Sequence, residues 1–198
     1  MSIVKVQGNA SGTGIFTVAS PNSNTDRTLT LPDNTGTLVS TGSTAGVTQA
    51  MLASGVAGNG PAFSAYLGST QTISTSVWTK AQFNTEFFDT NSNYDTTNYR
   101  FTPTVAGYYA VNYCLAFTTG AATGLYAGIY KNGSRIRYVV TYGGTNALDD
   151  WTNFGSSLLY MNGTTDYIEC WGLQVSGSPA FAGGTETSWF EASLVRAA

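Results

Sequence analysis

The stretch from Asn98 to Phe117 constrains the fold most, because large apolar side chains recur in it at every second position. Side chains two residues apart lie on the same face of an extended strand. The apolar face carries Tyr109, Val111, Tyr113, Leu115 and Phe117. Upstream, Pro103 and Gly107 bracket a turn, and we expect an extended piece that begins at Phe101 to form a hairpin with this strand. The stretch therefore predicts the central strand of a β-rich domain.

Short alternating segments continue from Pro61 to the C-terminal end, and turn residues separate them. The dipeptide Asn132-Gly133 lies between two such segments, and Asn-Gly favours the two-residue type I′ turn of a β-hairpin. We expect a second pair of strands, 156–161 and 166–173, to join across Asn162-Gly163. Many short strands with Gly and Asn turns are typical of a β-sandwich or a jelly roll.

Four segments of the chain occur in the order that one known family uses. Phe101, Gly107 and Tyr109, with the spacing F-x5-G-x-Y, resemble the central signature of the C1q domain, a member of the tumour necrosis factor-like jelly rolls. Residues 61–65 are similar to the opening strand of the family, and residues 188–194 are similar to its closing strand. Residues 163–170 are similar to a family strand with the pattern Gly-x-x-x-hydrophobic. The resemblance covers residues 60–196 and implies an all-β, C1q/TNF-like jelly-roll β-sandwich.

The same resemblance implies a homotrimer, because three protomers of that family pack side by side around an axis lined with aromatic and aliphatic residues. Four aromatic residues on strand faces opposite the predicted core suit such an interface: Tyr108, Tyr160, Tyr167 and Trp171. Exposed on a monomer, they would make an apolar patch larger than soluble proteins usually show. Glu191 and Ala192 depart from the Ser and Gly usual in the family, and the sequence has no counterpart of its acidic calcium loop. No family ligand or metal site is therefore carried over.

Residues 1–46 predict an extended, β-rich segment that attaches the chain to other proteins. Ordering a residue costs about 1.5 kcal/mol, which the few apolar side chains of this segment do not offset alone. The run Arg27–Val39, RTLTLPDNTGTLV, resembles a segment that recurs in phage tail-fibre and other virion appendage proteins. A hairpin with a Pro-Asp-Asn-Thr-Gly turn explains its residue types equally well. The segment includes a hinge at 40–46, a linker with a short helix follows at 47–60, and the knob is 61–198.

Charge and composition argue against several functions. Only 10% of the 198 residues are charged and the net charge is -3, so the clustered Lys and Arg that nucleic acid requires are missing. Histidine is absent, which removes most catalytic triads and zinc sites, and we expect no enzyme activity, metal or cofactor. No apolar run approaches the ~18 residues of a spanning helix, and the first residues lack the apolar core of a signal peptide. We therefore expect no membrane insertion, and assembly in a host cytoplasm.

Two cysteines, Cys114 and Cys170, lie inside predicted strands. Buried free thiols suit a protein assembled in a reducing compartment. A disulfide between neighbouring strands is the alternative.

The loop between two predicted strands at 142–151 is the candidate ligand-binding site. Aromatic faces stack on sugar rings, while Asp and Asn side chains bond to sugar hydroxyls. The candidates are Tyr142, Asn146, Asp149, Asp150 and Trp151. Glycoside hydrolysis uses a carboxylate pair, but adjacent strand residues such as Asp149 and Asp150 point apart, which argues against cleavage. The plainer interpretation is that Trp151 begins a buried strand and the acids keep the loop soluble.

Three cations beside the Asn132-Gly133 turn form a second candidate: Lys131, Arg135 and Arg137. They could meet an anionic surface sugar. The plainer interpretation is a solvated face.

The sequence thus predicts a structural protein of a phage virion. In the leading hypothesis it is a trimeric tail fibre or spike-type appendage whose knob adheres to host-surface glycan, and whose residues 1–46 bind other virion proteins. The first alternative is a capsid decoration, cement or head-fibre protein whose knob projects from the shell. A polysaccharide-cleaving tailspike and a non-viral C1q-like lectin are further alternatives.

Overall fold

The computed structural model describes residues 11–15, 17, 22–26, 28, 60–118, 122–142 and 151–198. The chain divides into two compact units, Met1–Ser40 and Thr41–Ala198. The described residues of the first unit form turns, bends and irregular chain. Most residues of the predicted β-rich segment at 1–46, including its hinge at 40–46, lie outside the described residues, and so does the predicted short helix.

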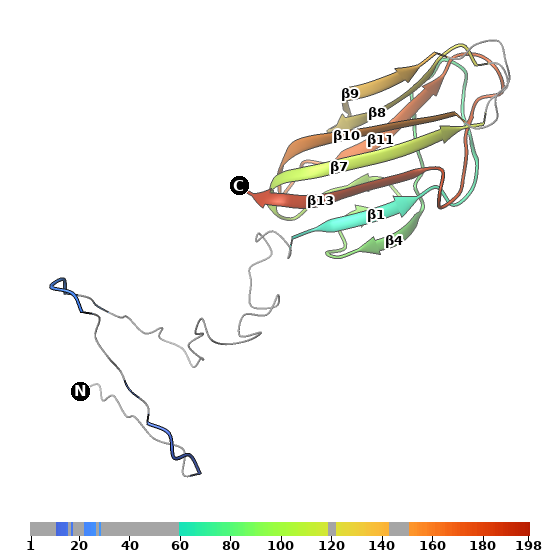
Figure 1. Cartoon of the computed structure of the whole chain (residues 1–198). Helices are drawn as coiled ribbons and strands as arrows, with labels where there is room; N and C mark the ends of the chain where they lie inside the picture. Colours follow the sequence, from blue (N-terminus) through green and yellow to red (C-terminus); the bar gives the residue numbers. More distant parts are fainter. Residues whose placement is uncertain are drawn as a thin grey trace. The chain divides into compact units, whose positions relative to one another are not determined.

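The described part of the second unit is built from strands alone (Figure 1). The thirteen strands are β1 (Ala62–Tyr66), β2 (Gln71–Thr72), β3 (Thr79–Lys80), β4 (Thr85–Asp89), β5 (Tyr94–Asp95), β6 (Arg100–Phe101), β7 (Ala106–Phe117), β8 (Leu125–Lys131), β9 (Ser134–Thr141), β10 (Trp151–Asn162), β11 (Ile168–Gln174), β12 (Ala180–Phe181) and β13 (Trp189–Ala197). All pairings between them are antiparallel.

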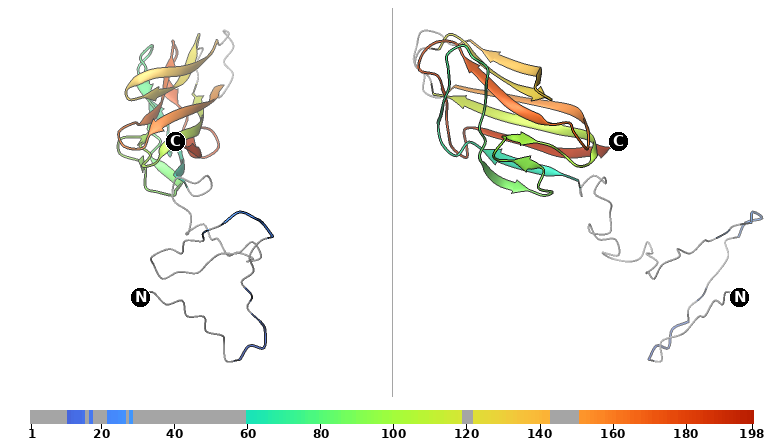
Figure 2. Two further views of the ribbon diagram at one scale, coloured as in Figure 1. Left: turned by 90° about the vertical axis from the view of Figure 1, so that its left-hand side faces the viewer. Right: turned by 180° about the vertical axis from the view of Figure 1, so that it is seen from behind.

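These strands form two sheets that face each other (Figures 1 and 2). In sheet A the long strands lie in the order β10-β7-β13-β1-β4, and β12 pairs with the end of β7 and with β2. In sheet B the order is β5-β6-β11-β8-β9, and β3 also pairs with β11. The prediction of an all-β jelly-roll sandwich is confirmed.

Strand β7 is the central strand that the alternation predicts. Its residues Tyr109, Val111, Tyr113, Leu115 and Phe117 are all buried in the core. The strand pairs with β10 along its whole length on one side and with β13 on the other.

The hairpin predicted from Phe101 to β7 is wrong. Phe101 belongs to β6, which pairs with β5 and β11 in sheet B, whereas β7 lies in sheet A. The turn residues therefore carry the chain from one sheet to the other. Phe101 still reaches the common core, where its ring centroid lies 5.7 Å from that of Tyr109.

The strand pair predicted across Asn162-Gly163 is also wrong, because β10 lies in sheet A and β11 in sheet B. Asn162 Oδ1 accepts hydrogen bonds from the backbone N–H groups of Thr164, Thr165 and Asp166, so this turn forms a corner between the sheets. The hairpin at Asn132-Gly133 is confirmed: it joins β8 to β9, and the φ angles are 53° and 76°.

The core is rich in aromatic rings that come from both sheets. Phe63 of β1 stacks on Tyr94 and on Phe101, each at a centroid distance of 4.6 Å, and meets Phe190 edge-on at 5.2 Å. Both cysteines are free thiols in the structure; Cys170 is buried and Cys114 is partly exposed. Two faces remain outside this core, the outer face of each sheet.

Candidate functional site

The outer face of sheet B carries a cluster of aromatic side chains. Strand β8 buries Leu125, Ala127 and Ile129, so the alternation turns Tyr126 and Tyr130 outward on either side of Gly128. Opposite Gly128 in register lie two further aromatics, Tyr138 of β9 and Trp171 of β11. Tyr130 and Trp171 stack with their centroids 4.6 Å apart.

Gly128 allows strand β9 to approach closely at this point. A Cβ at position 128 would clash with the Arg137 carbonyl oxygen and stand 2.8 Å from the Cβ of Tyr138, closer than real Cβ atoms approach such neighbours. Any larger residue would therefore displace β9 at Arg137 and Tyr138.

Trp78 lies at the centre of the cluster, although it comes from a separate segment of the chain. It precedes β3, whose Thr79 pairs with Gly172 of β11, and the N–H of Ser76 donates to the Gln174 carbonyl at 2.8 Å. These bonds hold the segment beside β11 in sheet B, so that the side chain of Trp78 reaches the cluster. The indole centroid lies 6.1 Å from Tyr126, 5.9 Å from Tyr130 and 6.2 Å from Tyr138.

Arg135 lies against two of these rings. Its Cζ is 4.7 Å from the ring centroid of Trp78 and 4.9 Å from that of Tyr138, which are favourable cation–π distances. A β-bulge places Arg135 opposite Tyr130 but Arg137 opposite the buried Ile129. The bulge therefore turns the two arginines to different sides of β9.

The three cations that the sequence groups together have separate surroundings. Lys131 Nζ pairs with Asp166 Oδ2 and donates to the Tyr160 carbonyl, both at 2.7 Å. Arg137 Nε donates to Ser157 Oγ at 2.7 Å. Across the described strands and loops of the knob, no carboxylate forms an ion pair with Arg135. Among the described residues Arg137 has no carboxylate partner either, but only Arg135 lies against the aromatic cluster, where its side chain also forms a hydrogen bond with Tyr130.

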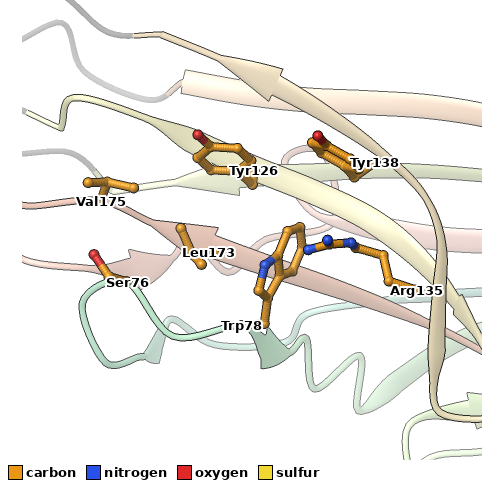
Figure 3. A pocket seen from close by; sticks show the side chains of 7 residues that line it. All are labelled: Ser76, Trp78, Tyr126, Arg135, Tyr138, Leu173 and Val175. Carbon is orange, nitrogen blue, oxygen red and sulfur yellow. The ribbon is translucent and has the colours of Figure 1, made fainter.

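These side chains line an open groove of about 290 Å³ (Figure 3). Its aromatic and charged walls are Trp78, Tyr126, Tyr138 and Arg135, and Figure 3 shows the Arg135 guanidinium directed at the indole of Trp78. Leu173 in β11 and Val175 directly after that strand add aliphatic surface to the groove, and Ser76 adds a hydroxyl group. The groove therefore offers flat rings, one cation and several hydroxyl groups to a ligand.

The predicted ligand loop meets this groove at one described residue. Tyr142 is 72% exposed, and the hydrogen bond between its side chain and Tyr126 raises the pKa of the Tyr126 hydroxyl. Trp151 opens β10 and packs partly buried against the core. Asn146, Asp149 and Asp150 lie outside the described residues.

The outer face of sheet A is the second surface. Apolar side chains lie on it in two groups, and a polar row crosses the sheet between them: Ser156, Asn112, Glu191 and Ser64. On β7 and β10, Tyr108 is 42% exposed, Tyr160 45%, Leu158 58% and Phe154 74%. The register pairs Tyr160 with Tyr108, Leu158 with Ala110 and Phe154 with Cys114. The same face continues across the sheet, because Trp189 of β13 lies next to Cys114 and Tyr66 of β1 lies next to Trp189.

The four residues predicted for a trimer interface are divided between several places. Tyr108 and Tyr160 touch on sheet A with their ring centroids 5.6 Å apart. Trp171 stacks in the aromatic cluster of sheet B. Tyr167 precedes β11, and its ring centroid lies 4.9 Å from Arg100 Cζ. They do not form one patch within a single knob.

Two further observations concern the described residues alone. They contain no group of three or more His, Cys, Asp or Glu side chains placed to hold a metal ion. They also contain no helix with the length and apolarity needed to cross a membrane.

Comparisons with known proteins identify the fold. No protein-family model and no curated protein matches the sequence. The globular domain of zebrafish complement 1qA protein superposes with a TM-score of 0.51 at 15% identity, covering 70% of this chain and 99% of that one. Crystal structures of murine APRIL at pH 8.0 and pH 5.0 superpose with TM-scores of 0.54 and 0.55 at 6% and 4% identity, each covering 68% of this chain and 98% of theirs. The knob therefore has the C1q/TNF-like jelly-roll fold that the sequence resemblance implies.

Proposed function

We propose that this protein is a structural protein of a bacteriophage virion, a homotrimeric appendage of the tail-fibre or spike type whose knob adheres to a glycan on the host surface. One observation carries the assembly in this proposal: the jelly-roll knob exposes Phe154, Leu158 and Tyr160 on the outer face of sheet A. Its two sheets leave different outer faces free for assembly and for adhesion.

The apolar face supports the assembly. Phe154, Leu158 and Tyr160 project from β10, which among the described strands pairs with β7 alone and so leaves one edge open. Exposed groups of large apolar side chains mark interaction sites on many proteins, and open strand edges invite pairing with another chain. Contacts between different surfaces of identical copies close into a ring when the rotation fits. Three knobs packed in this way would cover the sheet A faces, as the family resemblance implies.

The attachment of the chain to a virion is supported by the resemblance of Arg27–Val39 to appendage proteins. A capsid decoration or head-fibre protein is the second candidate, because a grip on capsid subunits would also order residues 1–46. Gold-labelled antibody raised against the knob distinguishes the two on purified virus particles. Label at the tail supports the appendage, whereas label over the shell supports decoration.

Adhesion is tested separately by incubating the full chain with an array of bacterial surface glycans. Retention of intact glycan supports adhesion. Release of reducing sugar from the same polysaccharides would show that the protein cleaves them, which would replace adhesion with the tailspike alternative. The Asp149→Asn, Asp150→Asn double variant would then show whether these two acids are the catalytic pair.

A further inference from the structure

We infer that the groove on the outer face of sheet B is the saccharide-binding site, and that it takes a sugar carrying a carboxylate, such as a uronic acid. This inference rests on the proposed adhesion and names both its site and the chemistry of its ligand. The groove is formed by Trp78, Tyr126, Tyr138 and Arg135.

The aromatic rings suit the apolar face of a sugar. Tyr126 and Tyr138 lie at an interplanar angle of 30°, with their centroids 6.1 Å apart, and so present two similarly directed faces. The plane of the Trp78 indole makes angles of 68° with the ring of Tyr126 and 84° with the ring of Tyr138, so the indole borders the surface that these two rings form. Amphipathic rings of this kind combine a flat apolar body with a polar end that remains hydrated. The hydroxyls of Tyr126, Tyr138 and Ser76 can bond to sugar hydroxyls around it.

The charge of the groove suits an acidic ligand. The guanidinium of Arg135 lies at cation–π distance from Trp78 and Tyr138, and a guanidinium can bind a carboxylate through its N–H groups. Neighbouring cations are already neutralised: Lys131 by Asp166 at 2.7 Å and Lys80 by Glu169 at 2.8 Å. Among the knob residues that the structure describes, neither Arg135 nor Arg137 has a carboxylate partner, but Arg137 lies on the other side of β9 and donates to Ser157 Oγ.

The net charge of the chain argues against a polyanion that is attracted over a long range. It favours a ligand that is recognised through direct contacts in the groove. The net charge is -3, so a long-range attraction for anions is missing. Arg135, the one cation of the groove, lies beside the rings of Trp78, Tyr126 and Tyr138. This arrangement favours a ligand that has a single carboxylate next to an apolar surface. Since sheet A is the face proposed to be covered in the trimer, the groove on sheet B stays accessible.

The experiment uses the full chain and an array of uronic-acid and sialic-acid oligosaccharides, each printed beside its carboxyl-reduced counterpart. We expect at least one acidic member to bind, and its reduced counterpart to bind about tenfold more weakly. Trp78→Ala and Arg135→Gln should each weaken binding to the acid by about tenfold or more, and Arg135→Gln should abolish the preference for the acid over the reduced form.

Matched variants separate the site from general damage. Arg137→Gln removes a cation from the same strand on its other side and should leave binding unchanged. Arg135→Lys keeps the charge without the planar group and should retain only part of the affinity. The thermal midpoint of each variant shows whether the knob is folded.

Each contrary outcome has its own meaning. If wild-type protein binds no glycan on either array, the proposed adhesion and this inference both fail. If it binds a glycan and neither Trp78→Ala nor Arg135→Gln weakens that binding, adhesion stands and this inference is wrong. Binding of a proline-rich peptide in the groove, with no acidic sugar bound, would also overturn it, because extended proline helices dock in aromatic grooves.

Discussion

The hydroxyl of Tyr113 donates a hydrogen bond of 3.0 Å to the backbone carbonyl of Ala127, across the interior of the sandwich. Tyr113 belongs to β7 of sheet A and Ala127 to β8 of sheet B, so one side chain connects the two layers. Opposite Tyr113 on β10 stands Gly155, where a Cβ would lie 2.6 Å from the Tyr113 hydroxyl oxygen. Burial raises the pKa of the Tyr113 hydroxyl, which therefore stays protonated as the donor.

Tyr113→Phe should lower the free energy of unfolding by about 1–2 kcal/mol, because the buried donor is lost while the ring stays. Urea unfolding at a fixed protein concentration measures the change. The control is Tyr138→Phe, whose ring is 52% exposed and whose change should stay within about 0.5 kcal/mol. Equal stability of the two variants would contradict a role for the hydroxyl between the sheets.

Asp166 should make the stability of the knob fall in acid. Partial burial opposes its ionisation, but hydrogen bonds from Lys131, Asn132 and the N–H of Asn162, with the charge of Lys131, hold the pKa of this carboxyl below its usual value. A carboxyl with a lowered folded-state pKa stabilises the fold above its unfolded pKa of about 3.9, and this contribution disappears as pH falls through the folded pKa.

Asp166→Asn should therefore cost about 1–2 kcal/mol at pH 7 and much less near pH 2 to 3. Urea unfolding of both proteins at each pH gives the difference. If the difference in the free energy of unfolding between wild type and variant stays constant over this pH range, the charge of Asp166 does not contribute to stability.

The two cysteines should differ from ordinary thiols in reactivity. Burial raises the pKa of Cys170, with a further contribution from the nearby Cys114, and burial raises the pKa of Cys114 as well. Since the thiolate is the reactive form, iodoacetamide at pH 8 should leave Cys170 unmodified in the folded protein and modify both residues in urea. Mass spectrometry of peptides, after exposure to iodoacetamide for set times, measures the alkylated fraction of each cysteine. Rapid alkylation of Cys170 without denaturant would contradict its placement in the core.

Local pattern was sufficient for the long strand and for one turn. The alternation of apolar residues in β7 predicts the buried face of that strand, and Asn132-Gly133 predicts the hairpin between β8 and β9. The two wrong pairings, at Phe101 and at Asn162-Gly163, have a common cause. Residues such as Pro, Gly and Asn show that the chain turns, but the same residues serve a hairpin and a corner between sheets. Which sheet the next strand joins depends on distant partners.

Of the groove on sheet B, the sequence indicates Arg135 but not the aromatic residues, for a similar reason. Trp78, Tyr126 and Tyr138 come from three segments that only the pairing of β3, β11, β8 and β9 brings together. A partial signal was present in LYAGIYK, where Tyr126 and Tyr130 flank a glycine on the face opposite the core residues. The separation of Arg135 from Arg137 follows from a β-bulge, which their spacing of two residues does not reveal.

The apolar face of sheet A can be tested by placing a charge in it. Leu158→Glu should shift the assembly toward monomer, because a carboxylate buried between copies loses its hydration without a partner. The matched control is Val77→Glu, which adds the same charge at a position 51% exposed on the sheet B side. Sedimentation velocity at equal concentrations compares them. If Leu158→Glu assembles like the control, that face is not the interface.

The most direct measurement is the mass of the unmodified full chain by light scattering coupled to gel filtration, at micromolar concentration. If two further copies cover the outer face of sheet A, the mass is close to three times the chain mass of 20.8 kDa. A single species with the mass of one chain would leave Phe154, Leu158 and Tyr160 in water and would contradict the proposed assembly.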